Sequence, residues 1–134
     1  MDPIRWDESF SVGVDILNRQ HLQIIKLINQ LSLDVKGGPP GECLSEAICQ
    51  LMVYSKEHFS TEEDLLERHA YPGLEAHRLK HRAFEERVLD FCENAMERKA
   101  ELVEDMLLFL SNWWVWHIQC EDMEYRPLLE AKRA

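Results

Sequence analysis

Residues that interrupt helices are concentrated at two places in this chain, and this distribution constrains the fold most. The segment 37–41, Gly-Gly-Pro-Pro-Gly, breaks the chain once, and Tyr71-Pro72-Gly73 breaks it again. Outside these breaks, apolar residues and histidines recur every three or four positions, as on one face of an α-helix. The polar segment 93–100 loses this period, and we expect a turn there. The sequence therefore predicts four amphipathic helices.

Each predicted helix has one stripe that should face inward. The stripes are Leu17, His21, Ile24, Ile25, Ile28 and Leu31; Leu44, Ala47, Leu51, Tyr54, His58, Glu62 and Leu65; Leu74, His77, His81, Phe84, Val88 and Phe91; and Leu102, Met106, Leu110, Trp113 and His117. Short connections make neighbouring helices antiparallel, so we expect an all-α, up-down-up-down four-helix bundle. Residues 1–14, with Trp6, Phe10, Val12 and Val14, should form an extended arm over it.

Composition limits the classes of protein to consider. A length of 134 residues suits a single domain, 1–134, and 46% hydrophobic with 30% charged residues is typical of a folded globular chain. No apolar run approaches the ~18 residues of a spanning helix, so membrane insertion is not expected. A net charge of -10 has the wrong sign for phosphate backbones, so we expect no nucleic-acid partner.

The chain start and the cysteines indicate the compartment. The first seven residues lack a basic stretch followed by an apolar core, so we expect a cytoplasmic protein. The four cysteines contain no C-x-x-C pair, and a reducing compartment disfavours disulfides. We therefore expect Cys43, Cys49, Cys92 and Cys120 to be buried as small apolar residues.

The histidines carry the chemistry. Five of the six fall on the inward stripes, and the pairs His58/Glu62 and His77/His81 are four apart, so each pair shares a helix face. Burying these groups in an apolar bundle without partners would cost several kcal/mol per ionised group, and a metal compensates most simply. His69 lies off the stripes near the end of the second helix, and we interpret it as structural.

The donor set favours iron over other metals. The ferritin-like plan places Glu three residues before His, and none of the six histidines has it. The H-E-x-x-H zinc motif is absent, and five histidines exceed one tetrahedral zinc site. We therefore expect two iron ions joined by a bridging oxo or hydroxo group.

The order of these residues resembles the hemerythrin family, specifically its bacterial members. The matching segments are Asn18-Arg19-Gln20-His21, His58-Phe59-Ser60-Thr61-Glu62, His77-x-x-x-His81 and His117-Ile118-Gln119-Cys120-Glu121-Asp122, with Trp6-Asp7, Ser11-Val12-Gly13-Val14 and Tyr125 in support. The segment Asp15-Ile16-Leu17-Asn18 departs from the pattern, because bacterial relatives more often carry an acidic residue before Gln-His. The resemblance covers nearly the whole chain.

The resemblance implies a ligand set. His77, His81 and His117 would bind one iron, His21 and His58 the other, and Glu62 and Asp122 would bridge them. Five residues at ~100° each put Asp122 off the face of His117 in an ideal helix, so the backbone must deviate or the helix must end there. Glu121 and Glu124 are the rivals of Asp122, which the family pattern favours.

The implied function is reversible dioxygen binding as carrier, store or sensor. An odd number of histidines leaves one iron with an open position. Ile24, Phe59, Trp113 and Ile118 match positions that line the oxygen pocket in similar proteins, and at least one of Trp114 and Trp116 must lie off the inward face. The alternatives are a di-iron enzyme, such as a peroxide or nitric oxide reductase, and a signalling module. An apolar pocket with only Cys120 as a polar group favours binding over turnover, and an oxygen-consuming protein partner stays unidentified.

Overall fold

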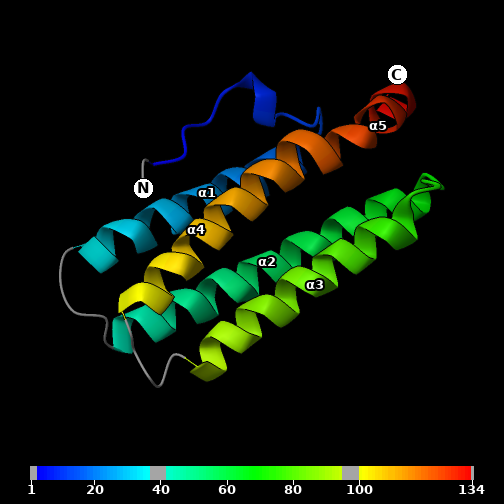
Figure 1. Cartoon of the computed structure of the whole chain (residues 1–134). Coiled ribbons are helices and arrows are strands. Elements are labelled where there is room, and N and C mark those ends of the chain that lie inside the picture. Colours follow the sequence, from blue (N-terminus) through cyan, green and yellow to red (C-terminus); the bar gives the residue numbers. More distant parts are fainter. Residues whose placement is uncertain (1–2, 37–41, 95–99, 134) are drawn as a thin grey trace.

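Four long antiparallel helices and a short terminal helix make up the fold (Figure 1). The structure, a computed structural model, describes residues 3–36, 42–94 and 100–133. The helices are α1 (Asp15–Lys36), α2 (Glu42–Arg68), α3 (Leu74–Asn94), α4 (Ala100–Trp116) and α5 (Arg126–Arg133). The predicted all-α, up-down-up-down bundle is confirmed, and none of its described helices combines the length and apolar character needed to cross a membrane.

The helices end where the sequence predicts. The segment 37–41 separates α1 from α2, and the predicted turn 93–100 coincides with the end of α3 and the start of α4, although 95–99 lie outside the described residues. After α2, Ala70 adopts a left-handed φ of 53°. The amide of Tyr71 donates to Leu66 O at 2.9 Å and that of Ala70 to Glu67 O at 3.0 Å, which is a Schellman cap.

Most of the predicted inward faces are buried. All six predicted residues of α1 are enclosed, as are five of the six on α3, where Leu74 is half-buried. Met106 and Leu110 on α4 are buried, as is His117, which directly follows this helix. The side chains of Leu44 and Leu102 lie outside the described part. The apolar residues of these faces belong to two clusters, a large one that includes Ile24, Phe84 and Leu110, and a smaller one of Val12, Leu17, Leu66, Tyr125 and Leu129.

On α2 the buried face is rotated relative to the prediction. Tyr54 is 37% exposed, so its assignment is wrong, and the predicted Ala47 and Leu65 are only half-buried. Ile48, Ser55 and Leu66 are buried in their place. The prediction followed apolar character, whereas a serine is small enough to be enclosed and a tyrosine ring with a polar tip suits a boundary with water.

The N-terminal arm lies along α1 and α4 (Figure 1). The backbone of Ile4 exchanges two hydrogen bonds with the Asn29 side chain, at 2.9 and 2.8 Å. Trp6 stacks on Phe10 at 5.5 Å between ring centroids, and Phe10 is buried in the core. The arm covers the bundle as expected, and a short 3₁₀ turn, η1 (Glu8–Phe10), interrupts its extended path.

Adjacent tryptophans on α4 have different environments. Trp114 is completely buried, Trp113 is half-buried and Trp116 is 65% exposed. Trp116 therefore lies off the inward face, as expected for one of the pair 114 and 116. The residue enclosed most deeply is Trp114 and not Trp113, because the buried face of α4 is broader than the predicted stripe.

The cysteine prediction is wrong where it can be assessed. Cys49 and Cys120 are exposed free thiols. Cys49 directly follows the buried Ile48, and the ~100° of helical rotation between neighbours places it on the solvent side. Cys120 comes two residues after the buried Ile118 and also lies on the outer side. The side chains of Cys43 and Cys92 lie outside the described part of the chain.

Candidate metal centre

Seven polar side chains meet in the middle of the apolar core, and they are the seven predicted ligands. None is more than 3% exposed. Their nitrogen and oxygen atoms form two clusters, each within 4.8 Å: Glu62, His77, His81 and His117; and His21, His58, Glu62 and Asp122. We call His77, His81 and His117 the three-histidine group, and His21 and His58 the two-histidine group.

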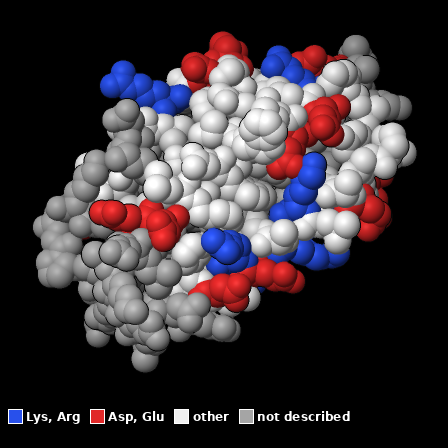
Figure 2. Space-filling view, viewed as in Figure 1, with Lys and Arg blue, Asp and Glu red and all other residues white. Residues whose placement is uncertain are grey.

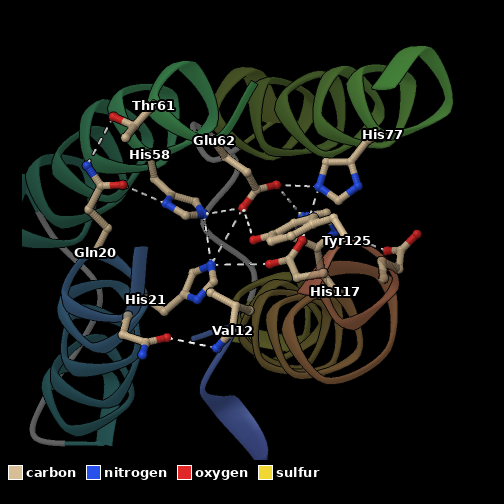
Figure 3. Close-up of polar contacts among 12 residues, drawn as sticks. Val12, Gln20, His21, His58, Thr61, Glu62, His77, His117 and Tyr125 are labelled. Carbon is tan, nitrogen blue, oxygen red and sulfur yellow. Dashed lines mark hydrogen bonds and ion pairs between the residues drawn. The ribbon is translucent and has the colours of Figure 1, made fainter. Parts of the chain in front are cut away.

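Glu62 lies between the two groups (Figure 3). Its Oε2 is 3.0 Å from His58 Nε2 and 3.8 Å from His21 Nε2. Its Oε1 contacts His77 Nε2 and lies 3.2 Å from His81 Nε2 and 3.8 Å from His117 Nε2. One carboxylate therefore presents one oxygen to each group, which is the geometry of a bridge.

Asp122 has the same relation to both groups. Its Oδ2 lies 3.2 Å from His21 Nε2, and its Oδ1 lies 3.0 Å from His77 Nε2 and 3.2 Å from His117 Nε2. Neither oxygen has a hydrogen-bond partner among the described residues, although both are buried. A buried carboxylate in that condition is costly, and a cation between the groups would satisfy it.

A change in helical geometry brings Asp122 to the centre. After α4 the chain forms a π-helical turn, η3 (His117–Glu121), and then a 3₁₀ turn, η4 (Asp122–Glu124). The Asp122 amide donates to His117 O, five residues earlier, so both side chains face the same way. The predicted backbone deviation is confirmed. Of the two rivals, Glu121 lies on the outer side of His117 and Glu124 is exposed.

The outward ring nitrogens of three histidines have fixed partners, which sequence reasoning did not identify. His58 Nδ1 donates to Gln20 Oε1 at 2.8 Å, His81 Nδ1 to Glu63 Oε2 at 2.9 Å, and His117 Nδ1 to Glu121 Oε1 at 3.1 Å. With Nδ1 as donor, the neutral ring directs the lone pair of Nε2 to the centre. Gln20 directly precedes His21 and Glu63 directly follows Glu62 in the sequence, and this adjacency could have identified both residues.

The inward ring nitrogens are spaced as two ligands of one metal ion would be. His81 Nε2 and His117 Nε2 are 3.0 Å apart, and His21 Nε2 and His58 Nε2 are 2.9 Å apart. Two acceptor nitrogens at that distance repel each other without a proton or cation between them. Two ligands about 2.1 Å from one ion and at right angles lie about 3 Å apart, so the spacing fits a shared metal.

The acid–base properties of the metal-free cluster follow from its charges. Burial alone would lower the pKa of His77 and His117, but Glu62 and Asp122 raise them to about 9 and about 10. Burial and the neighbouring His21 lower the pKa of His58 to about 4. Burial opposes ionisation of Glu62, yet hydrogen bonds from the histidines hold its pKa well below the usual range. The metal-free centre therefore contains ionised carboxylates beside protonated imidazoles.

Tyr125 contributes a further polar contact. Its hydroxyl donates to Glu62 Oε2 at 3.1 Å, and the ring is completely buried. Burial and the charges of Asp122 and Glu62 raise the pKa of this phenol well above its usual value, so it keeps its proton. Tyr125 thus holds the bridging position of Glu62 without competing for a cation.

The predicted pocket residues surround the histidines with apolar surface. Ile24, Phe59 and Ile118 are buried. Phe59 stacks on His81 at 3.9 Å between ring centroids, and Trp113 stacks on His117 at 4.4 Å. Trp114, which the prediction left outside the pocket, lies 5.8 Å from His58 and 6.1 Å from His117 between ring centroids. His69 is half-buried and belongs to neither cluster.

Comparisons with known proteins agree with this geometry. The model of the family described as "Hemerythrin HHE cation binding domain" matches residues 12–129. The chain is 27% identical to a bacteriohemerythrin of Stenotrophomonas maltophilia, over 94% of this chain and 81% of that protein. It is 28% identical to the myohemerythrin of Theromyzon tessulatum, over 96% and 95%. A crystal structure of a hemerythrin variant superposes with a TM-score of 0.86 at 25% identity, covering 96% and 98% of the two chains.

Proposed function

Because this chain belongs to the hemerythrin HHE cation-binding family, we propose that it binds dioxygen reversibly at two iron ions held by the seven buried side chains. The observation that carries the proposal is the pair of carboxylates that each present one oxygen to the three-histidine group and one to the two-histidine group. That arrangement supports two ions side by side, with an oxo or hydroxo group as a further bridge.

The two halves offer unequal numbers of protein donors. Three histidines and two carboxylate oxygens make five in one half, while two histidines and two carboxylate oxygens make four in the other. The missing donor leaves room for dioxygen in the half that contains the two-histidine group. The chemistry that a bound pair of iron ions supplies is the reversible transfer of one electron from each ion to dioxygen.

Apolar side chains keep the centre dry, and the described residues of the predicted pocket include no catalytic acid. Ile24, Phe59 and Ile118 exclude water from the centre. Cys120, the polar group that the sequence analysis considered for the pocket, is exposed. Tyr125 donates its proton to Glu62 and retains it. These features support a binding protein rather than a peroxide or nitric oxide reductase.

We also infer a single domain over residues 1–134, since the family match leaves only short segments at each end.

The surface carries both signs of charge on the face in Figure 2, with acidic and basic groups interspersed. Together with the net charge of -10, this supports the expectation that nucleic acid is not a partner. The cytoplasmic location stays a prediction.

The first test is anaerobic loading with ferrous iron, followed by exposure to air and then to vacuum. We expect two irons per chain and a visible absorption band that appears with oxygen and disappears under vacuum. The His69→Ala variant, altered at the one histidine outside the clusters, should behave like the parent. A content of one zinc, failure to retain iron, or sustained turnover of peroxide or nitric oxide would contradict the proposal.

Iron binding is expected to release protons, and the apparent affinity for iron is expected to increase as the pH rises. The pKa is about 9 for His77 and about 10 for His117, so at neutral pH both rings are protonated in the metal-free protein. Each ring must lose one proton to bind a metal. Between pH 6 and 8 the apparent affinity should rise up to about tenfold per pH unit for each proton displaced. Calorimetry in buffers of different ionisation enthalpy counts the protons. Loading without proton release would contradict this.

Water admitted to the pocket should shorten the lifetime of the oxygenated protein. Ile118→Asn and Ile24→Asn each place a hydrogen-bonding group in a buried, low-dielectric position without removing a ligand. We expect both variants to keep two irons and to autoxidise several-fold faster, measured as decay of the visible band. Leu108→Asn, at an exposed position on α4, is the control. Parent rates in both pocket variants would mean that these side chains do not guard the open position.

A further inference from the structure

The outer hydrogen bonds of the histidines differ in charge between the two halves of the centre. In the three-histidine group, His81 and His117 donate to the carboxylates of Glu63 and Glu121. In the two-histidine group, His58 donates to the neutral amide of Gln20. His21 Nδ1 is buried and has no partner among the described residues. Two carboxylates thus stand behind one group and none behind the other.

Each outer carboxylate is held in place by a cation on its solvent side. Arg78 Nε lies 3.1 Å from Glu63 Oε1, and Lys80 Nζ lies 2.5 Å from Glu121 Oε2. The carboxylates are 22% and 12% exposed, whereas the cations are 24% and 44% exposed. Glu121 is much less exposed than Lys80, whereas Glu63 and Arg78 are about equally exposed. In both pairs the carboxylate is the group that contacts the imidazole, so its negative charge acts on the ring at the shorter range.

Hydrogen bonds also fix the orientation of Gln20, the neutral partner of His58. Gln20 Nε2 donates to Thr61 Oγ1 at 3.2 Å, and Thr61 Oγ1 donates to Glu57 O at 3.0 Å. This chain orients the amide so that its oxygen, and not its nitrogen, faces His58 (Figure 3). The contrast between the two groups therefore follows from the relative positions of α1, α2, α3 and η3.

An anionic acceptor at Nδ1 makes an imidazole a stronger donor to a metal at Nε2, and a more highly charged ion gains more from it. Resting on the proposed function, we propose that Glu63 and Glu121 are positioning residues that polarise the iron pair. In the half-oxidised protein they hold the ferric ion at the three-histidine group and leave the ferrous ion at the two-histidine group. Reaching this arrangement from its reverse moves one electron between the ions, oxidising one and reducing the other, with no atom gained or lost.

The experiment uses the iron-loaded protein and two readouts. The midpoint potential of the first one-electron oxidation reports the ion that is oxidised first. The affinity of the half-oxidised protein for azide, followed by electron paramagnetic resonance, reports how often a ferric ion occupies the open half. Glu63→Gln and Glu121→Gln should each change the equilibrium between the two arrangements about tenfold, within the range typical of outer-shell partners. That corresponds to a potential about 59 mV higher, with correspondingly tighter azide binding.

Variants that change the charge around the histidines in the opposite direction distinguish an electrostatic effect on the iron pair from a general disturbance of the site. Lys80→Gln leaves Glu121 uncompensated and should lower the potential, while Gln20→Glu adds a carboxylate to the two-histidine group and should tighten azide binding. Glu75→Gln is the matched control, because Glu75 pairs with Arg78 at 2.6 Å but is exposed and makes no contact with the cluster histidines in the described part.

Iron content distinguishes failure of this inference from failure of the proposed function. If the parent does not retain two irons, the proposed function is wrong. If two irons are retained, the inference is overturned by unchanged potential and azide affinity in both glutamine variants. It is also overturned if Lys80→Gln and Glu121→Gln shift the potential in the same direction.

Discussion

Replacement of Glu62 by glutamine is expected to abolish stable iron retention, because this carboxylate faces all five histidines of the centre. An amide cannot offer an anionic oxygen to both groups. Outer-shell partners of a metal typically contribute 10–100-fold in affinity, so loss of a ligand shared by two ions should exceed about 100-fold. Iron per chain after desalting, and competition with a chelator, measure the effect.

Two neighbouring carboxylates provide controls for this result. Asp64→Asn changes an exposed residue of the same helix and should retain two irons. Glu63→Gln removes only the outer partner of His81, so iron should be held more weakly than in the parent but far better than in Glu62→Gln. Equal retention in the Glu62 and Glu63 variants would mean that Glu62 is not the bridging carboxylate.

Replacement of Trp114 by alanine is expected to have the largest effect on stability. The ring is completely buried, stacks on Phe59 at 5.4 Å between centroids, and packs beside His58 and His117. Truncating a buried tryptophan typically costs about 3–5 kcal/mol through lost contacts and the cavity left behind. The midpoint of thermal unfolding should fall by roughly 10–20 °C, as measured by circular dichroism.

The same helix supplies the control for this second experiment. Trp116 lies two residues further on and is 65% exposed, so Trp116→Ala should change stability by no more than about 0.5 kcal/mol. Trp113→Ala should fall between the two, because its half-buried ring stacks on His117. Similar losses for the alanine variants at 114 and 116 would show that enclosure of Trp114 does not stabilise the bundle.

The four long helices, their ends and the inward histidines could be predicted from the sequence because these properties are local, whereas the short terminal helix α5 was not predicted. The 3.6-residue period places His21 on the face of Ile24 and Ile28, and His77 one turn before His81, whatever lies opposite. Breakers such as Pro72 act on the backbone within one turn. The family resemblance added Asp122, which periodicity placed off the face of His117.

Rotations and contacts between elements were decided only by the tertiary structure. The exposure of Tyr54 and the burial of Ser55 depend on how α1 and α3 pack against α2. The burial of Trp114 likewise depends on side chains of other helices, such as Phe59 on α2 and Phe84 on α3.

In the candidate metal centre, too, some features were determined by the sequence and others only by the tertiary structure. Chain order supplies the seven ligands, but the π-helical turn at His117 brings Asp122 to them, and its hydrogen-bond pattern differs from the regular helical period. The outer partners Gln20 and Glu63 lie 38 and 18 residues from the histidines that they orient. A sequence period describes one helix at a time, whereas these contacts are made when separate helices are packed together and each polar atom must find a partner away from water.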